Sequence, residues 1–371
     1  MSEKKRNPAA DILRCFAFFC VVSVHFFLNN GFYQHKVDGP RMFVMTVMRT
    51  FFMICVPLFL MLTGYLMRKK TLSKAYYGKV GKTVLTYLLA GVFCRLFAVF
   101  YLQQDLTWKE GIFSFFNFTA APYAWYIEMY LGLFLLTPFL NLIYNNLPSQ
   151  NWKKVLLLSF LLLTALPPLV NVYNFQSAEW WLHPATSTTY NKLMPGWWTN
   201  FYPITYYFLG CYVGEYGVKI KKRWNLLLMA GTTLVAGTYS YWRSNGAKFV
   251  WGIWGNYHSL FTVILTVLVF VFIINRNYEK VSGRFARFLQ GVSGLCLGGY
   301  LVSWIFDQLF YPMLEERVPL VTDRMLYYVV IVPAVYILSL GLSFVLSKLQ
   351  GLIEWVWSAL AQKIKNRKAS E

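Results

Sequence analysis

Long apolar runs without charge are the feature that most constrains this chain. Residues 155–173 (VLLLSFLLLTALPPLVNVY) contain no charged side chain, and residues 257–274 are similar. A helix needs about 20 such residues to cross the roughly 30 Å hydrocarbon core of a bilayer. Only helices and closed barrels satisfy their backbone hydrogen bonds in lipid, and continuous apolar runs of this length indicate helices. We therefore expect an all-α membrane protein.

Runs of this kind recur along the whole chain, and the composition is 57% hydrophobic with only 13% charged residues. The sixth run contains Pro203 and many tyrosines, which suits a helix facing a polar interior better than one facing lipid. We predict a polytopic transmembrane helical bundle of about ten spans within a single domain, 1–348. The predicted spans are 10–28, 42–67, 83–102, 123–144, 155–173, 197–217, 225–242, 257–274, 291–312 and 326–347.

The positive charge of the chain is distributed unevenly between its loops. A net charge of +20 would suggest nucleic acid in a soluble protein. Here, about three times as many Lys and Arg fall in the loops of one side as in those of the other, which marks the cytoplasmic side and places the N-terminus there. The expected partner is the lipid bilayer and not nucleic acid. Residues 349–371 space apolar side chains helically before a basic end, which predicts an amphipathic cytoplasmic tail on the inner leaflet.

The first predicted span carries three ionisable residues, Asp11, Arg14 and His25. Each costs at least about 2.5–3.5 kcal/mol inside a membrane helix, so each needs a partner or a purpose. Arg14 and His25 are eleven residues apart, which places them within about 20° of one helix face and about 16–17 Å from each other. An arginine at the inner mouth can bind phosphates, and a neutral histidine deeper in the bilayer can accept a proton from a hydroxyl.

An acyl-CoA matches this geometry, because a charged nucleotide end and a reactive thioester are joined by a slim pantetheine arm. The alternative is structural: Arg14 reaches the lipid phosphates of the inner leaflet, and His25 hydrogen-bonds a neighbouring helix. Spacing alone leaves both interpretations open.

The order of several motifs resembles the bacterial acyltransferase 3 family of integral-membrane O-acyltransferases. The first-helix pattern Asp11-x-Leu13-Arg14, followed by ten residues and then His25, is its most specific part. Later matches are Val56-Pro57-Leu58-Phe59 with Thr63-Gly64-Tyr65, Ala124-Trp125-Tyr126-Ile127 with Thr137-Pro138, and Tyr207-Phe208 with Gly210. Two family histidines are replaced, by Ala124 before the Trp-Tyr pair and by Ser303 in the ninth span. His258 is the candidate to substitute for the second one.

The resemblance implies acyl transfer, and the buried polar residues supply candidate roles. Glu128 is expected to orient His25 or to pair with an arginine, and Asp307 to bind an acceptor hydroxyl or to face water. The predicted catalytic residues are His25, Arg14, Asp11 and Glu128. The predicted substrate-binding residues are Arg14, Arg49, Arg95, Trp125, Tyr126, Tyr300, Ser303 and Asp307.

The expected function is transfer of an acyl group, expected to be acetyl, from cytoplasmic acyl-CoA to a hydroxyl of a cell-envelope glycan at the bacterial cytoplasmic (inner) membrane. His25 would act as general base or as transient acyl carrier. The chain lacks GxxxxGK[ST], HExxH, GxSxG and metal-spaced Cys/His motifs, so we expect no metal and no tightly bound cofactor. The alternative is a non-enzymatic transporter or exporter of a small solute.

Overall fold

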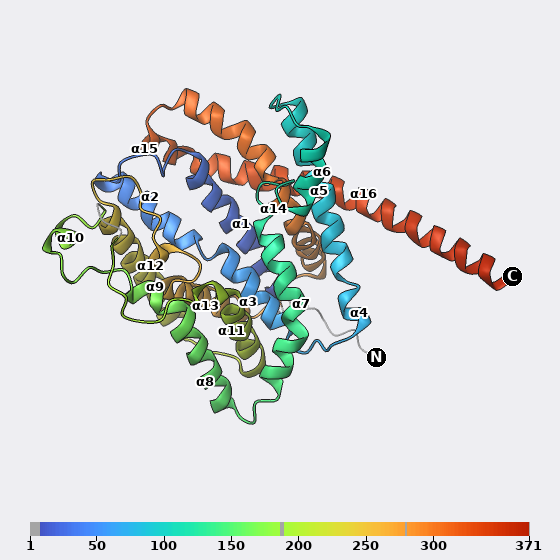
Figure 1. Ribbon diagram of the computed structural model, residues 1–371, viewed down its shortest axis with the longest axis horizontal. Coiled ribbons are helices and arrows are strands. Elements are labelled where there is room, and N and C mark those ends of the chain that lie inside the picture. Colours follow the sequence, from blue (N-terminus) through green and yellow to red (C-terminus); the bar gives the residue numbers. More distant parts are fainter. Residues whose placement is uncertain (1–7, 186–188, 279, 371) are drawn as a thin grey trace.

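The structure is a computed structural model that describes residues 8–185, 189–278 and 280–370. It is built from helices, and the described residues contain no β-strand. Figure 1 shows the helices packed side by side into one bundle, with the C-terminal helix extending well beyond it. The predicted all-α polytopic bundle is confirmed. Residues 1–7 of the predicted domain and residue 371 of the predicted tail lie outside the described part of the chain.

Eight helical segments among the described residues are long and apolar enough to cross a membrane. Several of them join two helices across a short break. They are α1 (Ala9–Asn29), α2 (Gly39–Phe52) with α3 (Cys55–Met67), α4 (Lys74–Tyr77) with α5 (Val80–Phe100), α7 (Trp125–Asn145), α8 (Gln150–Phe160) with α9 (Pro167–Val170), the short η3 (Ile253–Gly255) with α13 (Leu260–Ile274), α14 (Gly283–Arg317), and α15 (Val321–Arg324) with α16 (Tyr328–Ser370) as far as Leu360.

About ten spans were predicted, and eight segments of the described residues meet this measure of length and composition. The sixth and seventh predicted spans are helices, α11 (Tyr202–Tyr216) and α12 (Lys222–Ser244), but neither is among the eight. The first has only 15 residues and begins at a Tyr-Pro pair. The second is long enough, yet its Thr, Ser, Tyr and Asn side chains lower its hydropathy.

The remaining helices are short, and the last one is unusually long. α6 (Trp108–Phe116) and α10 (Ala178–Leu182) lie in connections between spans. α16 has 43 residues and continues without a break past residue 348. The predicted tail is thus the continuation of the last span and not a separate helix, and it projects away from the bundle (Figure 1).

The helix that carries the polar residues, α1, lies at the centre of the bundle. It packs against α2, α3, α13, α14 and α16, and its aromatic residues Phe18, Phe26 and Phe27 are fully buried. Lipid tails are as apolar as these side chains, so close packing and not the hydrophobic effect holds such helices together. The position of α1 therefore gives its polar side chains several neighbouring helices from which to find partners.

Helices α3 and α11 cross closely, and each presents one glycine to the backbone of the other helix. A Cβ added to Gly64 would lie 1.9 Å from the carbonyl oxygen of Tyr207, and one added to Gly210 would lie 2.0 Å from that of Met61. Small residues at such crossings let backbones approach closely in membranes. The two glycines thus fix how α11 packs on the bundle, although α11 is too short to count as a span.

Gly64→Ala is expected to destabilise the protein, because its methyl group forces α3 and α11 apart. Overpacking of this kind typically costs about 1–3 kcal/mol, so the midpoint of thermal unfolding in detergent should fall clearly below that of the wild type. Gly132→Ala is the control, since nothing lies within 4 Å of a Cβ added at Gly132 in α7. Equal midpoints for the two variants would contradict this account of the crossing.

Candidate functional site

Polar contacts join α1 to α14 toward each end of α1. Near its start, the guanidinium of Arg14 donates a hydrogen bond of 2.6 Å to Ser293 Oγ and lies 3.5 Å from Asp11 Oδ1. Near its end, His25 Nδ1 lies 3.6 Å from Asp307 Oδ2. Arg14 and His25 therefore face the same neighbouring helix, as a spacing of eleven residues predicts.

The imidazole of His25 is almost enclosed. Its ring packs on that of Tyr123, with centroids 3.9 Å apart, and Nδ1 is buried without a hydrogen-bond partner among the described residues. The side chain keeps 10% exposure. The ring thus presents Nδ1 to a carboxylate, and Nδ1 contributes nothing to this exposure.

The carboxylate opposite His25 is held by neutral donors. Tyr123 Oη donates to Asp307 Oδ2 at 2.7 Å, and Asn29 Nδ2 approaches the same oxygen at 3.4 Å. Asp307 is 1% exposed, and no arginine or lysine of the described residues pairs with it. A buried carboxylate beside a histidine stabilises the imidazolium that forms when the histidine accepts a proton. A histidine beside a buried carboxylate is the arrangement that general-base catalysis uses.

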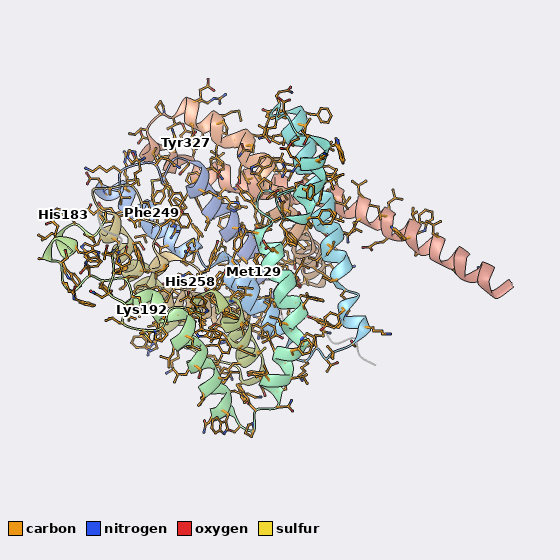
Figure 2. All side chains as sticks on the ribbon, viewed as in Figure 1. Met129, His183, Lys192, Phe249, His258 and Tyr327 are labelled. Carbon is orange, nitrogen blue, oxygen red and sulfur yellow. The ribbon has the colours of Figure 1, made fainter. Side chains whose placement is uncertain are left out.

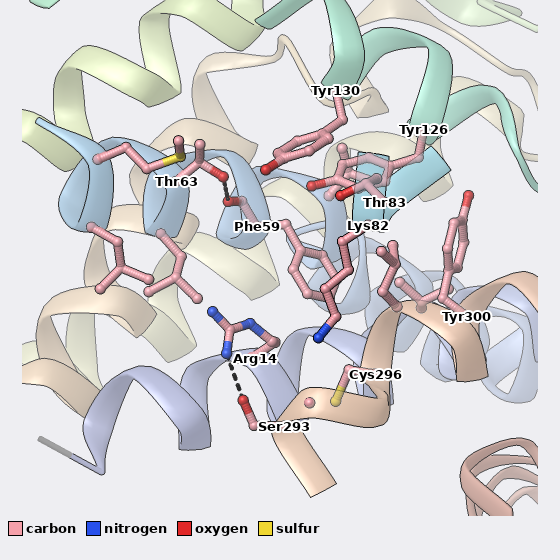
Figure 3. Close-up of a pocket in the computed structure, with 17 residues that line it drawn as sticks. Arg14, Phe59, Thr63, Lys82, Thr83, Tyr126, Tyr130, Ser293, Cys296 and Tyr300 are labelled. Carbon is pink, nitrogen blue, oxygen red and sulfur yellow. Dashed lines mark hydrogen bonds between the residues drawn. The ribbon is translucent and has the colours of Figure 1, made fainter. Parts of the chain in front are cut away.

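A cavity of about 550 Å³ opens beside Arg14. Arg14 and Lys82 both reach into it, as Figure 3 shows, and its walls are otherwise mostly apolar, with Val21, Phe59 and Leu62 among them. Its lining residues extend along α1, α3 and α7 as far as Tyr126, Tyr130 and Tyr300. The ring centroid of Tyr300 lies 6.5 Å from that of His25. The cavity therefore runs from two cations to within one side chain of the imidazole.

A second cavity, of about 530 Å³, lies at the other end of α1. Its lining is polar, with Asn29, Gln34 and His35 on one side and an ion pair of 2.8 Å between Arg324 and Glu315 on the other. Asn29 also donates to the His25 carbonyl at 2.9 Å, so this one residue touches both the cavity and the histidine–carboxylate pair. The pair consequently lies between the two cavities.

The predicted contact between Glu128 and His25 is absent, and Asp307 occupies that place instead. Glu128 lies at an exposed position in the first turn of α7, and within the described residues it forms no ion pair with Arg49 or Arg95. Tyr126 and Glu128 are two residues apart in α7, so their side chains project from different faces of the helix. Tyr126 is the one that lines the Arg14 cavity. Its predicted catalytic role has no contact in the structure to support it.

The two other predicted arginines lie away from both cavities. Arg49 is buried, donates to Tyr33 Oη and to the Gly255 carbonyl at 3.0 Å each, and stacks over Trp251 at 4.8 Å. Arg95 bonds the carbonyl oxygen of Thr119. Both arginines are thus occupied by partners in the protein, and their predicted substrate-binding role stays without a supporting contact.

The aromatic and hydroxyl residues that were predicted to bind substrate fall into two groups, those that line the Arg14 cavity and those that do not. Tyr126 and Tyr300 line the Arg14 cavity. Trp125 is 40% exposed and stacks on Tyr257 with centroids 5.7 Å apart. Ser303 is buried and donates to the Tyr300 carbonyl of its own helix. Only the two tyrosines therefore lie where a ligand would pass.

The histidine considered as a substitute, His258, lies elsewhere. Its ring packs near that of Tyr202, with centroids 5.9 Å apart. No contact joins it to His25 in the part of the chain that the structure describes. In the same residues, no group of three or more His, Cys, Asp or Glu could hold a metal ion.

Four residues of the site escaped the sequence analysis: Asn29, Tyr123, Ser293 and Lys82. Asn29 follows His25 by four positions and so shares its helix face, a signal that was available. Tyr123 stands just before the Ala-Trp-Tyr motif. Ser293 and Lys82 belong to no motif, and only the packing of α14 against α1 and of α5 against α14 brings them to the cavity.

Fold and site together define a multi-pass membrane protein with a buried histidine–carboxylate pair between two cavities. A comparison with protein-family models matches residues 7–348, nearly the whole chain, to the acyltransferase domain of the acyltransferase 3 family. The chain belongs to the acyltransferase 3 family and is a membrane acyltransferase. The resemblance carried by its first-helix residues is thus confirmed. No curated protein and no solved structure matches the chain.

Asp307→Asn is expected to slow acyl transfer by about 10²-fold or more while the protein still folds, because a neutral amide cannot stabilise the imidazolium of His25. The rate of acyl transfer by the purified full chain measures this. Asp323→Asn is the matched control, since Asp323 pairs with Arg41 on the exposed surface and its loss should leave the rate unchanged. Similar rates for both variants would remove Asp307 from the mechanism.

Proposed function

We propose that the protein transfers an acyl group, acetyl in the simplest case, from cytoplasmic acyl-CoA to a hydroxyl of a cell-envelope glycan at the bacterial inner membrane. The observation that carries the proposal is the pair of cavities at opposite ends of α1 with His25 and Asp307 between them. A donor and an acceptor that come from different sides of a membrane require such an arrangement.

The features of the Arg14 cavity support an acyl-CoA donor. Two cations, Arg14 and Lys82, line it, and the excess of positive loops predicts that this end of α1 is cytoplasmic. Arginine and lysine bind phosphates by charge-assisted hydrogen bonds. The long apolar wall suits a pantetheine arm, which would place the thioester against Tyr300. The thioester then reaches His25 once the ring of Tyr300 moves aside.

The chemistry proposed at His25 is general-base catalysis. Its free nitrogen accepts the proton of the acceptor hydroxyl as that oxygen attacks the thioester carbonyl. Collapse of the tetrahedral adduct breaks the C–S bond, and the imidazolium returns the proton to the departing thiolate, so that an ester and free CoA are formed. Asp307 stabilises the imidazolium, while Tyr123 and Asn29 hold Asp307 in place.

The second cavity supports a hydroxyl-rich acceptor. Asn29, Gln34 and His35 offer neutral donors and acceptors, which are the groups that recognise sugar hydroxyls. The one arginine of this cavity, Arg324, is paired with Glu315 and with backbone carbonyls. The cavity therefore suits a neutral polar ligand better than an anion.

His25→Ala is expected to reduce O-acylation of the host's surface glycan to background, because it removes the proposed general base between the two cavities. His183→Ala is the control: Figure 2 shows His183 at the edge of the molecule beside α10, and its side chain is 63% exposed. Acylation is measured as ester-linked acyl groups released from the surface polymer at matched protein levels. Normal acylation in cells that carry His25→Ala would end the proposal.

An acyltransferase and a transporter differ in what they do with a labelled donor. Inverted vesicles that hold the protein and a glycan acceptor, when supplied with acyl-labelled acyl-CoA, should accumulate label on the acceptor, and His25→Ala vesicles should not. Uptake of an intact solute into vesicles without acyl transfer would instead identify a carrier.

A further inference from the structure

A third cavity adjoins the Arg14 cavity, and the reaction described above leaves it without a role. It has a volume of about 320 Å³ and lies between α5, α14 and α16. The two cavities share Lys82, Thr83, Gly294 and Leu297. Unlike its neighbour, the third cavity is lined mainly by polar side chains, among them Thr86, Ser343, Ser347, Gln350 and Glu354.

The continuation of α16 past residue 348 forms one wall of this cavity. Gln350 is buried, accepts a hydrogen bond of 3.0 Å from Thr86 of α5, and donates to Glu354 at 2.9 Å. These contacts tie the helix continuation to α5 before it leaves the bundle. They also place an amide and a carboxylate, both suited to hydrogen-bonding a heterocyclic base, at the far wall of the cavity.

Lys82 stands at the junction of the two cavities. Its ammonium group points into the space in which Arg14 ends (Figure 3). Among the described residues no carboxylate forms an ion pair with Lys82, and Arg14 has only Asp11, at 3.5 Å. Two cations with a single acidic neighbour favour an anion between them.

We propose that the third cavity binds the nucleoside end of the donor, an inference that rests on the proposed function. Lys82 and Arg14 then bind the phosphates that link the nucleoside to the pantetheine arm. The order of chemistry along the cavities then matches the order along CoA. Polar groups for base and ribose come first, two cations follow, and an apolar channel leads to His25. The donor is thereby recognised at a part that does not react.

The experiment fills the third cavity without disturbing the fold. A Cβ added at Gly351, which lines the cavity, meets nothing within 4 Å, and the same holds at Gly341 on the same helix, outside the cavity. Both can be changed to leucine, a better helix former than glycine. Titration calorimetry on the full chain in detergent then compares the binding of CoA with that of 4′-phosphopantetheine, which lacks the adenosine 3′,5′-bisphosphate part of CoA and keeps one linking phosphate.

Gly351→Leu is expected to weaken CoA binding by about tenfold or more and to leave 4′-phosphopantetheine binding unchanged, whereas Gly341→Leu should change neither. Lys82→Gln should weaken both ligands, with Lys79→Gln, an exposed lysine at the start of the same helix, as its control.

Two results would overturn the assignment while the proposed function stands: CoA binding to Gly351→Leu as tight as to the wild type, or equal affinity of the wild type for CoA and 4′-phosphopantetheine. The second result would point to a lipid headgroup in the cavity. A wild-type protein that binds neither ligand would overturn the proposed function as well.

Discussion

The register between α1 and α14 is the constraint on which the rest of the site depends. A carboxylate and an imidazole buried at membrane depth are costly unless they meet each other or a hydrogen-bond donor. His25 and Asp307 meet only if the two helices pack in one register, which the Arg14–Ser293 hydrogen bond fixes near the other end of α1. Between these contacts, a Cβ on Gly299 would lie 3.1 Å from Phe18, so the glycine lets the helices approach.

Arginines inside the bundle differ in their partners. Arg49 and Arg243 are enclosed by aromatic rings and carbonyl oxygens; the guanidinium of Arg243 lies 3.6 Å from the ring centroid of Trp254. Cation–π contacts replace water for such groups and leave no open side for a ligand. Arg14, by contrast, has a hydroxyl partner and a cavity before it. An intramembrane arginine thus indicates a site only when part of its guanidinium stays unoccupied.

Sequence periodicity predicted the parts of the structure that depend on a single helix. The first span was predicted at 10–28 and found at Ala9–Asn29, and the common face of Arg14 and His25 follows from helix geometry alone. What failed depends on how helices rotate against each other. Glu128 was placed beside His25 because it follows the Trp-Tyr motif, whereas Asp307 reaches His25 from a helix far away in sequence. Similarly, α11 and α12 were predicted as spans from their apolar residues, and they are helices, but by length and mean hydropathy they are not among the eight candidates.

The two cavities on α1 also differ in charge, and this difference bears on how one bundle can serve two reactants. Lys82 and Arg14 make the first cavity cationic, on the side where positive loops predict the cytoplasm, whereas Glu315 neutralises Arg324 in the second. An anionic donor is therefore attracted to one end of α1 and has no cation to hold it at the other. Tyr126 and Tyr300 pack edge to face at the end of the first cavity, with ring centroids 5.9 Å apart. These aromatic side chains separate the first cavity from the second. Under the proposed function, this charge asymmetry and the aromatic barrier would hold an anionic donor at the end of α1 where it enters.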